Sequence, residues 1–238
     1  MTATDTDAIF DIYVETRSPS ESIALASTSA TTAKGNGPSR WPSLSAAGLV
    51  VAFDSDATNL SPSDTDSTSD VYVKNLATGA ITLASTTAAG VKGNGKSRSP
   101  SLSADGTKVA FLSHATNLDP RDTETSPDVY VKNLVTGDLT LVTVNSSGAK
   151  ANDSAGEPVL AAGGGSVAFG SAASNLVPAD MDHYQDVYVK NLVTSVLTLV
   201  STTTAGVKGN ARSLDPTISA DGRLVAFTSD ATNLDPTD

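Results

Sequence analysis

The sequence contains no cysteine, which excludes a disulfide framework, a thiolate metal site and a cysteine nucleophile. Basic residues are few: 15 lysines and arginines stand against 26 aspartates and glutamates, and the formal net charge is −11. Nucleic acids and anionic membranes bind basic faces, so we expect neither as a partner, whereas cations and basic proteins remain compatible with this charge. No segment approaches the roughly 18 consecutive apolar residues of a transmembrane helix, so we expect no membrane insertion.

Sequence signals for catalysis are also scarce. Two histidines are present, His114 and His183, and they occupy different positions of the repeat described below. The sequence has no Gly-x-Ser-x-Gly elbow, phosphate-binding loop, HExxH motif or dinucleotide-binding fingerprint. The segment 1–7 lacks the basic and apolar regions of a signal peptide. We therefore expect a chain without a signal peptide that is not an enzyme.

A repeat of 58 residues covers most of the chain. The segment Ser-Arg-Trp-Pro-Ser-Leu-Ser begins at Ser39 and returns in related form at positions 97, 155 and 213. A second segment, Asp-Val-Tyr-Val-Lys-Asn-Leu, begins at positions 70, 128 and 186, and the variant Asp-Ile-Tyr-Val begins at Asp11. Strong internal repetition is typical of solenoids, propellers and other repeat architectures.

Each repeat is predicted to contain four short strands, named A to D. In the unit that begins at position 97, strand A is 100–103, strand B is 108–113, strand C is 128–134 and strand D is 139–143. The Asp-Gly pair at 105–106 predicts a tight A–B turn, and β-branched and aromatic residues fill the strands. Four-stranded sheets that repeat around an axis are propeller blades, and stacking buries both faces of each sheet. A linear β-solenoid is the alternative, although solenoid coils are usually shorter.

The run Pro-Ser-Leu-Ser-Ala-Asp-Gly-x-x-Val-Ala-Phe at 100–111 resembles the repeat of the TolB-type, WD40-like β-propeller family. The continuation at 115–122 and 128–131 resembles a subgroup common in bacterial surface and secreted proteins. The resemblance covers nearly the whole chain. It implies a propeller that mediates protein contacts and that is secreted, periplasmic or on a bacterial cell surface. The segment 161–165 and Ala47 depart from the pattern, so we expect weaker turns there.

The chain begins just before a strand C and ends just after a strand B. We therefore expect one domain, 1–238, with the units 39–96, 97–154 and 155–212 and a fourth unit, 213–238, completed by 1–38. The expected fold is an all-β, four-bladed propeller with four antiparallel strands per blade. Pairing of the N- and C-terminal strands, the velcro closure, would remove the open sheet edges. The expected state is a monomer, and an eight-bladed ring made by two chains is the alternative.

The B–C and D–A loops are long, and a propeller places both kinds on one face. Long loops on a rigid scaffold usually carry the binding residues. Here each kind of loop repeats one polar residue: Asn59, Asn117, Asn175 and Asn233 in the B–C loops, and Lys34, Lys92, Lys150 and Lys208 in the D–A loops. We predict that these eight residues ring the binding face.

Acidic residues recur in the B–C loops with one spacing: Asp64, Asp66 and Asp70; Asp122, Glu124 and Asp128; Asp180, Asp182 and Asp186. Such carboxylates can converge on Ca²⁺, which takes six to eight oxygen ligands. The glycine and the terminal bidentate glutamate of an EF-hand are absent, however. The alternative is structural: aspartate and asparagine cap turns by bonding nearby backbone N–H groups, and the loop lysines pair with these carboxylates.

The sequence therefore predicts a non-enzymatic protein-interaction or scaffold propeller that binds a protein partner through its loop face. No cofactor is required by any motif. The alternative, of a different class, is a Ca²⁺-binding, lectin-like or adhesion module, in which the nine acidic residues above are the metal ligands.

Overall fold

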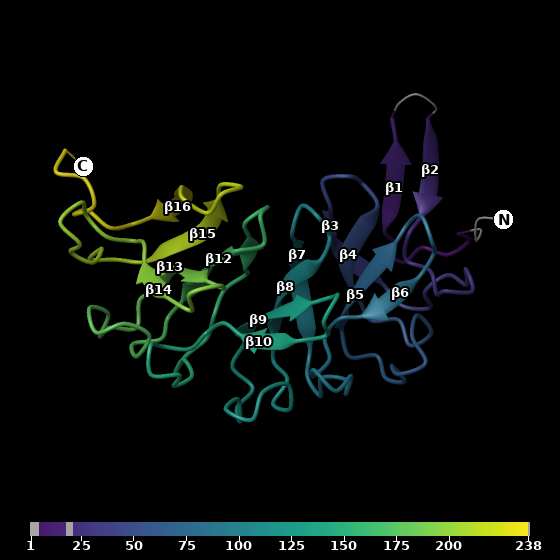
Figure 1. The fold of residues 1–238 in the computed structure, drawn as a ribbon, viewed down its shortest axis with the longest axis horizontal. Helices are drawn as coiled ribbons and strands as arrows, with labels where there is room; N and C mark the ends of the chain where they lie inside the picture. The colour runs from purple at the N-terminus through teal and green to yellow at the C-terminus, as the bar shows by residue number, and fades with distance from the viewer. Residues whose placement is uncertain (1–4, 18–20, 238) are drawn as a thin grey trace.

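The computed structural model describes residues 5–17 and 21–237, and the regular secondary structure in this part of the chain is all β-strand. None of the described residues belongs to a helix long and apolar enough to cross a membrane. The strands form five antiparallel sheets, three with four strands and two with two strands (Figure 1).

The three complete sheets fall on three successive repeats, and each is an up-and-down meander in which neighbouring strands along the chain pair. The first blade is β3 (Ser39–Leu44), β4 (Val50–Ser55), β5 (Asp70–Asn75) and β6 (Ile81–Leu83). The second is β7 (Ser97–Leu102), β8 (Lys108–Ser113), β9 (Asp128–Asn133) and β10 (Leu139–Leu141). The third is β11 (Val159–Leu160), β12 (Ser166–Ser171), β13 (Asp186–Asn191) and β14 (Leu197–Leu199).

The predicted strands are confirmed with small shifts at their ends. In the second blade strand A starts at Ser97 instead of Pro100, because Ser97 and Arg98 pair with β8 before a bulge shifts the register. Pro100 lies within this irregular part, where a missing backbone N–H breaks no ladder bond. Strand D ends at Leu141, two residues earlier than predicted. The A–B turn forms at Gly106, whose φ of 70° is accessible to glycine without strain.

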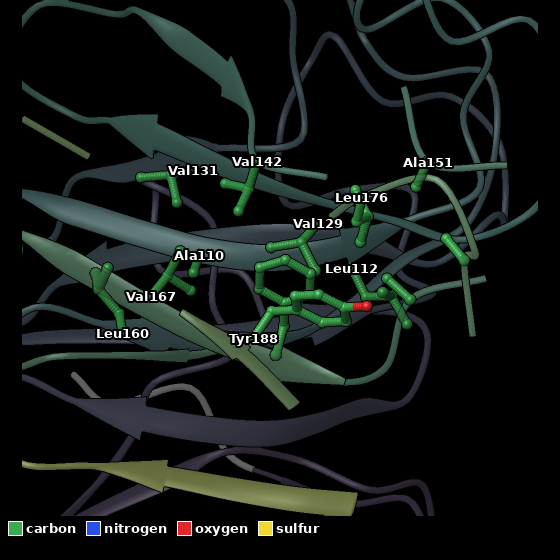
Figure 2. Close-up of a cluster of buried hydrophobic side chains, with 13 residues drawn as sticks. Ala110, Leu112, Val129, Val131, Val142, Ala151, Leu160, Val167, Leu176 and Tyr188 are labelled. Atoms are coloured by element: carbon green, nitrogen blue, oxygen red, sulfur yellow. The ribbon is translucent and has the colours of Figure 1, made fainter. Parts of the chain in front are cut away.

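Apolar faces of successive blades pack against each other and form the core. Figure 2 shows one such cluster, in which Ala110, Val129 and Val131 of the second blade face Leu160 and Tyr188 of the third. Within each complete blade a phenylalanine of strand B stacks on a tyrosine of strand C, with ring centroids 5.8–6.1 Å apart. Strands B and C are covered on both faces, which explains the unbroken apolar runs at their centres, Val109 to Leu112 and Val129 to Val131.

The two ends of the chain form half-blades that do not meet. Strands β1 (Tyr13–Thr16) and β2 (Ser22–Leu25) are one two-stranded sheet, and β15 (Ser213–Ile218) and β16 (Val225–Ser229) are another. They lie at opposite ends of an open arc (Figure 1). The structure thus differs from the expected closed four-bladed ring: the velcro pairing of terminal strands is not formed. The packed faces between successive blades set the curvature of the arc, and within one chain this curvature leaves the ends apart.

Candidate functional site

Each B–C loop and the D–A loop that follows it meet around one lysine. Lys92 Nζ lies 3.5 Å from an oxygen of Asp64, 3.0 Å from Asp66 and 2.9 Å from Asp70. The same arrangement joins Lys34 to Asp5, Asp7 and Asp11, Lys150 to Asp122, Glu124 and Asp128, and Lys208 to Asp180, Asp182 and Asp186. We call these four arrangements the lysine–carboxylate clusters. They bring together all nine acidic residues that the sequence singled out.

Further side chains hold the inner carboxylates of each cluster. Tyr72 donates a hydrogen bond from its hydroxyl to Asp64, and Ser85 donates one to Asp70 at 2.6 Å. Both carboxylates are buried, whereas the side chain of Asp66 is 56% exposed. The clusters of the three complete blades therefore have two buried inner carboxylates and one outer carboxylate that faces solvent, whereas in the N-terminal cluster only the side chain of Asp11 is buried.

Burial and pairing set the charges of this site. Burial raises the pKa of Asp70 to about 6, although the hydrogen bonds from Lys92 and Ser85 oppose that shift. The bond from Lys92 lowers the pKa of the outer Asp66. Burial would lower the pKa of Lys92 itself, but the bonds to Asp70 and Asp66 outweigh it and raise that pKa. The lysine is therefore a fixed cation at neutral pH.

The four asparagines predicted for the binding face join the same two loops. Asn59 accepts the backbone N–H of Asn36 at 3.0 Å and donates to the carbonyl of Lys34 at 2.8 Å. Asn117, Asn175 and Asn233 make the matching pairs of bonds. The lysine side chains are only 9–14% exposed. The structure thus places all eight predicted residues within the loops, where their polar atoms bond to other loop residues.

The residues fit a hard cation only in part. In three clusters one oxygen from each of the three carboxylates lies within 4.8 Å of the others: Asp5, Asp7 and Asp11; Asp64, Asp66 and Asp70; Asp180, Asp182 and Asp186. These are ligands that Ca²⁺ accepts. The lysine ammonium already occupies the space on which they converge, and it supplies the positive charge that the buried carboxylates need.

The histidines do not join these clusters. His114 Nδ1 lies 2.9 Å from the carbonyl oxygen of Thr125. The His183 side chain is 73% exposed and its Nδ1 lies 3.7 Å from Asp153. Neither position brings a histidine, a hydroxyl nucleophile and an acid into the relay that acyl transfer uses.

Sequence reasoning missed Asp54, which is buried in β4 outside the clusters. Its Oδ1 accepts the backbone N–H of Ser99 at 3.3 Å, and burial raises its pKa to about 6. The equivalent positions of the next two repeats hold Leu112 and Gly170. An aspartate at a strand position where the next two repeats carry leucine and glycine was the signal in the sequence that could have pointed to this buried carboxylate.

Comparisons with known proteins bear on the fold. No protein-family model and no curated protein matches the sequence. Among solved structures, a putative TolB from Agrobacterium tumefaciens is similar with a TM-score of 0.58 and 15% identity over 95% of this chain. TolB from Acinetobacter baumannii is similar with a TM-score of 0.52 and 18% identity over 89% of this chain. An oligogalacturonate lyase in complex with manganese is similar with a TM-score of 0.50 and 15% identity over 89% of this chain.

The chain spans 65% and 41% of the length of the two TolB structures and 50% of the lyase. At these identities the likeness concerns the fold alone, and the neighbours include both TolB and an enzyme. Repeated four-stranded blades, stacked face to face, and the likeness to TolB lead to one conclusion. The chain is a TolB-like β-propeller in its fold.

Proposed function

We propose that this chain is a non-enzymatic protein-interaction module that binds a protein partner through its long loops. One observation carries the proposal: the same lysine–carboxylate cluster recurs along the arc, together with the same pair of asparagine hydrogen bonds between the B–C and D–A loops. These contacts fix a row of surface loops. Rigid loops lose little conformational entropy on binding, which favours recognition. The resemblance to surface and secreted propellers extends the proposal to a location outside the bacterial cytoplasm.

The outer members of the clusters give this surface its character. Asp7, Asp66, Glu124 and Asp182 keep 46–56% of their side chains exposed. Apolar side chains lie in the same loops: Met181 is 83% exposed, Tyr184 53%, and Val91 and Val207 57% each. An acidic rim around exposed apolar and aromatic anchors fits a basic protein surface that carries apolar side chains.

The clusters themselves also favour binding over catalysis. Their carboxylates are paired with a lysine and repeat from blade to blade, whereas a catalytic acid–base pair is needed once. The Ca²⁺-dependent, lectin-like alternative rests on the three groups of converging carboxylates. We favour lysine as the resident cation because its Nζ lies within 2.7–2.9 Å of an inner carboxylate oxygen in every cluster.

Strand β13 allows a matched test of the loop surface. Tyr184 lies just before this strand in the B–C loop, and Val193 lies just after it in the C–D turn. A photo-crosslinking residue at position 184 is expected to capture a defined protein partner in cells, whereas the same residue at 193 is not. The Tyr184→Ala and Met181→Ala variants should then weaken binding of that purified partner about tenfold or more, because exposed aromatic anchors dominate such interfaces. Crosslinking from 193 alone, or unchanged affinity of both variants, would contradict the proposal.

A further inference from the structure

The two half-blades have complementary open edges. Within the described residues β1 pairs with β2 alone, and β16 pairs with β15 alone. By their place in the repeat, β15 and β16 are strands A and B, whereas β1 and β2 are strands C and D. In the first blade the B–C pairing that is missing here joins six residues of β4 to six of β5, with Ser55 opposite Asp70. Unpaired edges of this kind recruit another strand.

The side chains at these edges match the complete blades. The repeat places Phe227 of β16 opposite Tyr13 of β1, in the positions of the stacked pair Phe53 and Tyr72. Tyr72 is fully buried, whereas Tyr13 is 45% exposed. Ala226, whose equivalents Ala52, Ala110 and Ala168 are fully buried, is exposed. The half-blades thus leave open the apolar surfaces that complete blades cover.

Strand β3, the inner strand of the first blade, also lacks a complete preceding blade to pack against. Leu44 of β3 is 52% exposed, whereas its equivalents Leu102 and Leu160 are 7% and 5% exposed. Beside it a hollow of about 490 Å³ is lined by Phe10, Tyr13, Trp41 and Pro42. At the next junction strand B of the preceding blade, with Asp54, packs on the start of β7. The hollow is therefore the place of a missing strand B.

One chain cannot fill this place from its own β16 while its blade junctions keep their packing. The junctions repeat closely similar contacts: Ala46 N–H donates to the carbonyl of Ala104 at 2.9 Å and Ala104 to that of Ala162 at 2.8 Å. At the third junction the donor is shifted by one residue, and Gly163 donates to the carbonyl of Ala220 at 3.0 Å. The resulting arc holds β1 and β16 at opposite ends (Figure 1). A second copy, turned by a two-fold axis, presents β1 to β16 and β16 to β1 at once.

We propose that two copies of this chain close one ring with eight blades, in which β16 of each copy pairs with β1 of the other. Each of the two shared blades then takes strands A and B from one copy and strands C and D from its partner. The expected register sets Ser229 opposite Asp11 and stacks Phe227 on Tyr13. Leu44 and the hollow beside Trp41 become covered by the partner's β16.

The oligomeric state of the 238-residue chain tests this proposal. Light scattering and sedimentation are expected to give a dimer of the 24.0 kDa chain. Leu44→Lys and Ala226→Lys each introduce a charge at the junction, and each should weaken dimerisation at least a hundredfold. Both sites are exposed in a single copy, so the variants should remain folded by circular dichroism. Val135→Lys, at a 76% exposed site in the β9–β10 turn, is the control and should remain a dimer.

Trp41 is the one tryptophan and reports on the same junction. Its emission should shift to longer wavelength when dilution or Leu44→Lys dissociates the dimer. A monomer at every concentration would overturn the proposal: with buried Trp41 it would indicate closure within one chain, and with exposed Trp41 it would indicate a different partner for the open edges. A dimer that survives both junction variants would place the interface elsewhere.

Discussion

The repeated lysine is the residue that organises the loop surface. Lys92 touches three carboxylates of one B–C loop, and two of these are buried. A buried charge that loses its partner is strongly destabilising, because the remaining charge is no longer compensated. The clusters should therefore act as internal ties that keep the loops in one conformation.

We predict that Lys92→Met lowers the free energy of unfolding by about 3 kcal/mol, because it leaves Asp64 and Asp70 without their cation. Urea unfolding measures this change. Lys96→Met removes an exposed lysine four residues away and should change stability by less than about 0.5 kcal/mol.

The wild type and Lys92→Met together also test whether a lysine ammonium or a metal ion is the cation of the cluster. Millimolar Ca²⁺ should raise the melting temperature of Lys92→Met, whose three carboxylates are then open to a cation, and leave the wild-type value unchanged, as should EDTA. An increase in the melting temperature of the wild type with Ca²⁺ that EDTA reverses would favour the Ca²⁺-binding alternative.

Asp54 provides a pH-dependent prediction. Its folded pKa of about 6 lies above the ordinary 3.8, so the folded state binds the proton more tightly. Its unfavourable contribution is absent below pH 3.8, grows as the pH rises from 3.8 to about 6, and is constant above that. Asp54→Asn should therefore gain up to about 3 kcal/mol of unfolding free energy at pH 8 and well under about 1 kcal/mol at pH 4. Equal gains at both pH values would show that ionisation is not the cause. Asp138→Asn, at an exposed carboxylate, is the control.

At the scale of the strand, a second set of lysines joins each blade to the one before it. Lys132 of β9 is buried and donates to the carbonyls of Thr86 and Thr87 at 3.2 and 2.9 Å. Lys74 makes the equivalent bonds to Thr28 and Ser29. A charged donor shared by two carbonyls of the neighbouring D–A loop holds the blades in register.

We predict that Lys132→Met lowers the unfolding free energy by about 2 kcal/mol, because the two carbonyls of the preceding loop lose a charged donor. Chemical denaturation measures the difference, again with Lys96→Met as the control for loss of a positive charge. Unchanged stability would mean that relief from burying the lysine charge offsets the lost bonds.

The strands themselves follow from local patterns. Alternation, the Asp-Gly turn and the repeat fixed the strand order and most bounds in advance. The weaker turns expected at 161–165 and at Ala47 are not seen: Gly164 N–H donates to the carbonyl of Ala161 at 2.8 Å and Gly48 N–H to that of Ser45 at 2.9 Å, as Gly106 does to Ser103. Strand β11 is only two residues long because it begins at Val159, at the end away from the turn. The bulge after Arg98 was not predictable from local pattern, because it depends on pairing with β8 and on the contact with the preceding blade.

At the scale of the whole molecule, Glu15 of β1 carries a negative charge at a position where the other repeats carry a positive one. The complete blades hold Lys74, Lys132 and Lys190 there. In the proposed ring Glu15 faces the partner's Thr202 and Thr203 carbonyls, where those lysines would donate hydrogen bonds. Glu15 is exposed in the single copy, so its replacement does not disturb the core.

We predict that Glu15→Lys tightens the dimer about tenfold or more, because it restores the bonds that Lys132 makes. Sedimentation across a dilution series measures the dissociation constant. Glu21→Lys, an equal charge change at another exposed residue, should alter it by less than about threefold. A dimer weakened by Glu15→Lys would contradict the register proposed for β16 and β1.

The amino-acid sequence by itself determined the blades, because a strand depends on alternation, turn residues and repetition that are all local. It also indicated which acids, lysines and asparagines share the loops. Only the tertiary structure decided that the lysines sit among the carboxylates and that the asparagines bond to loop backbone, since those contacts join residues 22–29 positions apart. The curvature of the arc could not be predicted from local sequence pattern either. It is the sum of the packing angles between blade faces, and side-chain packing between residues far apart in the sequence sets these angles.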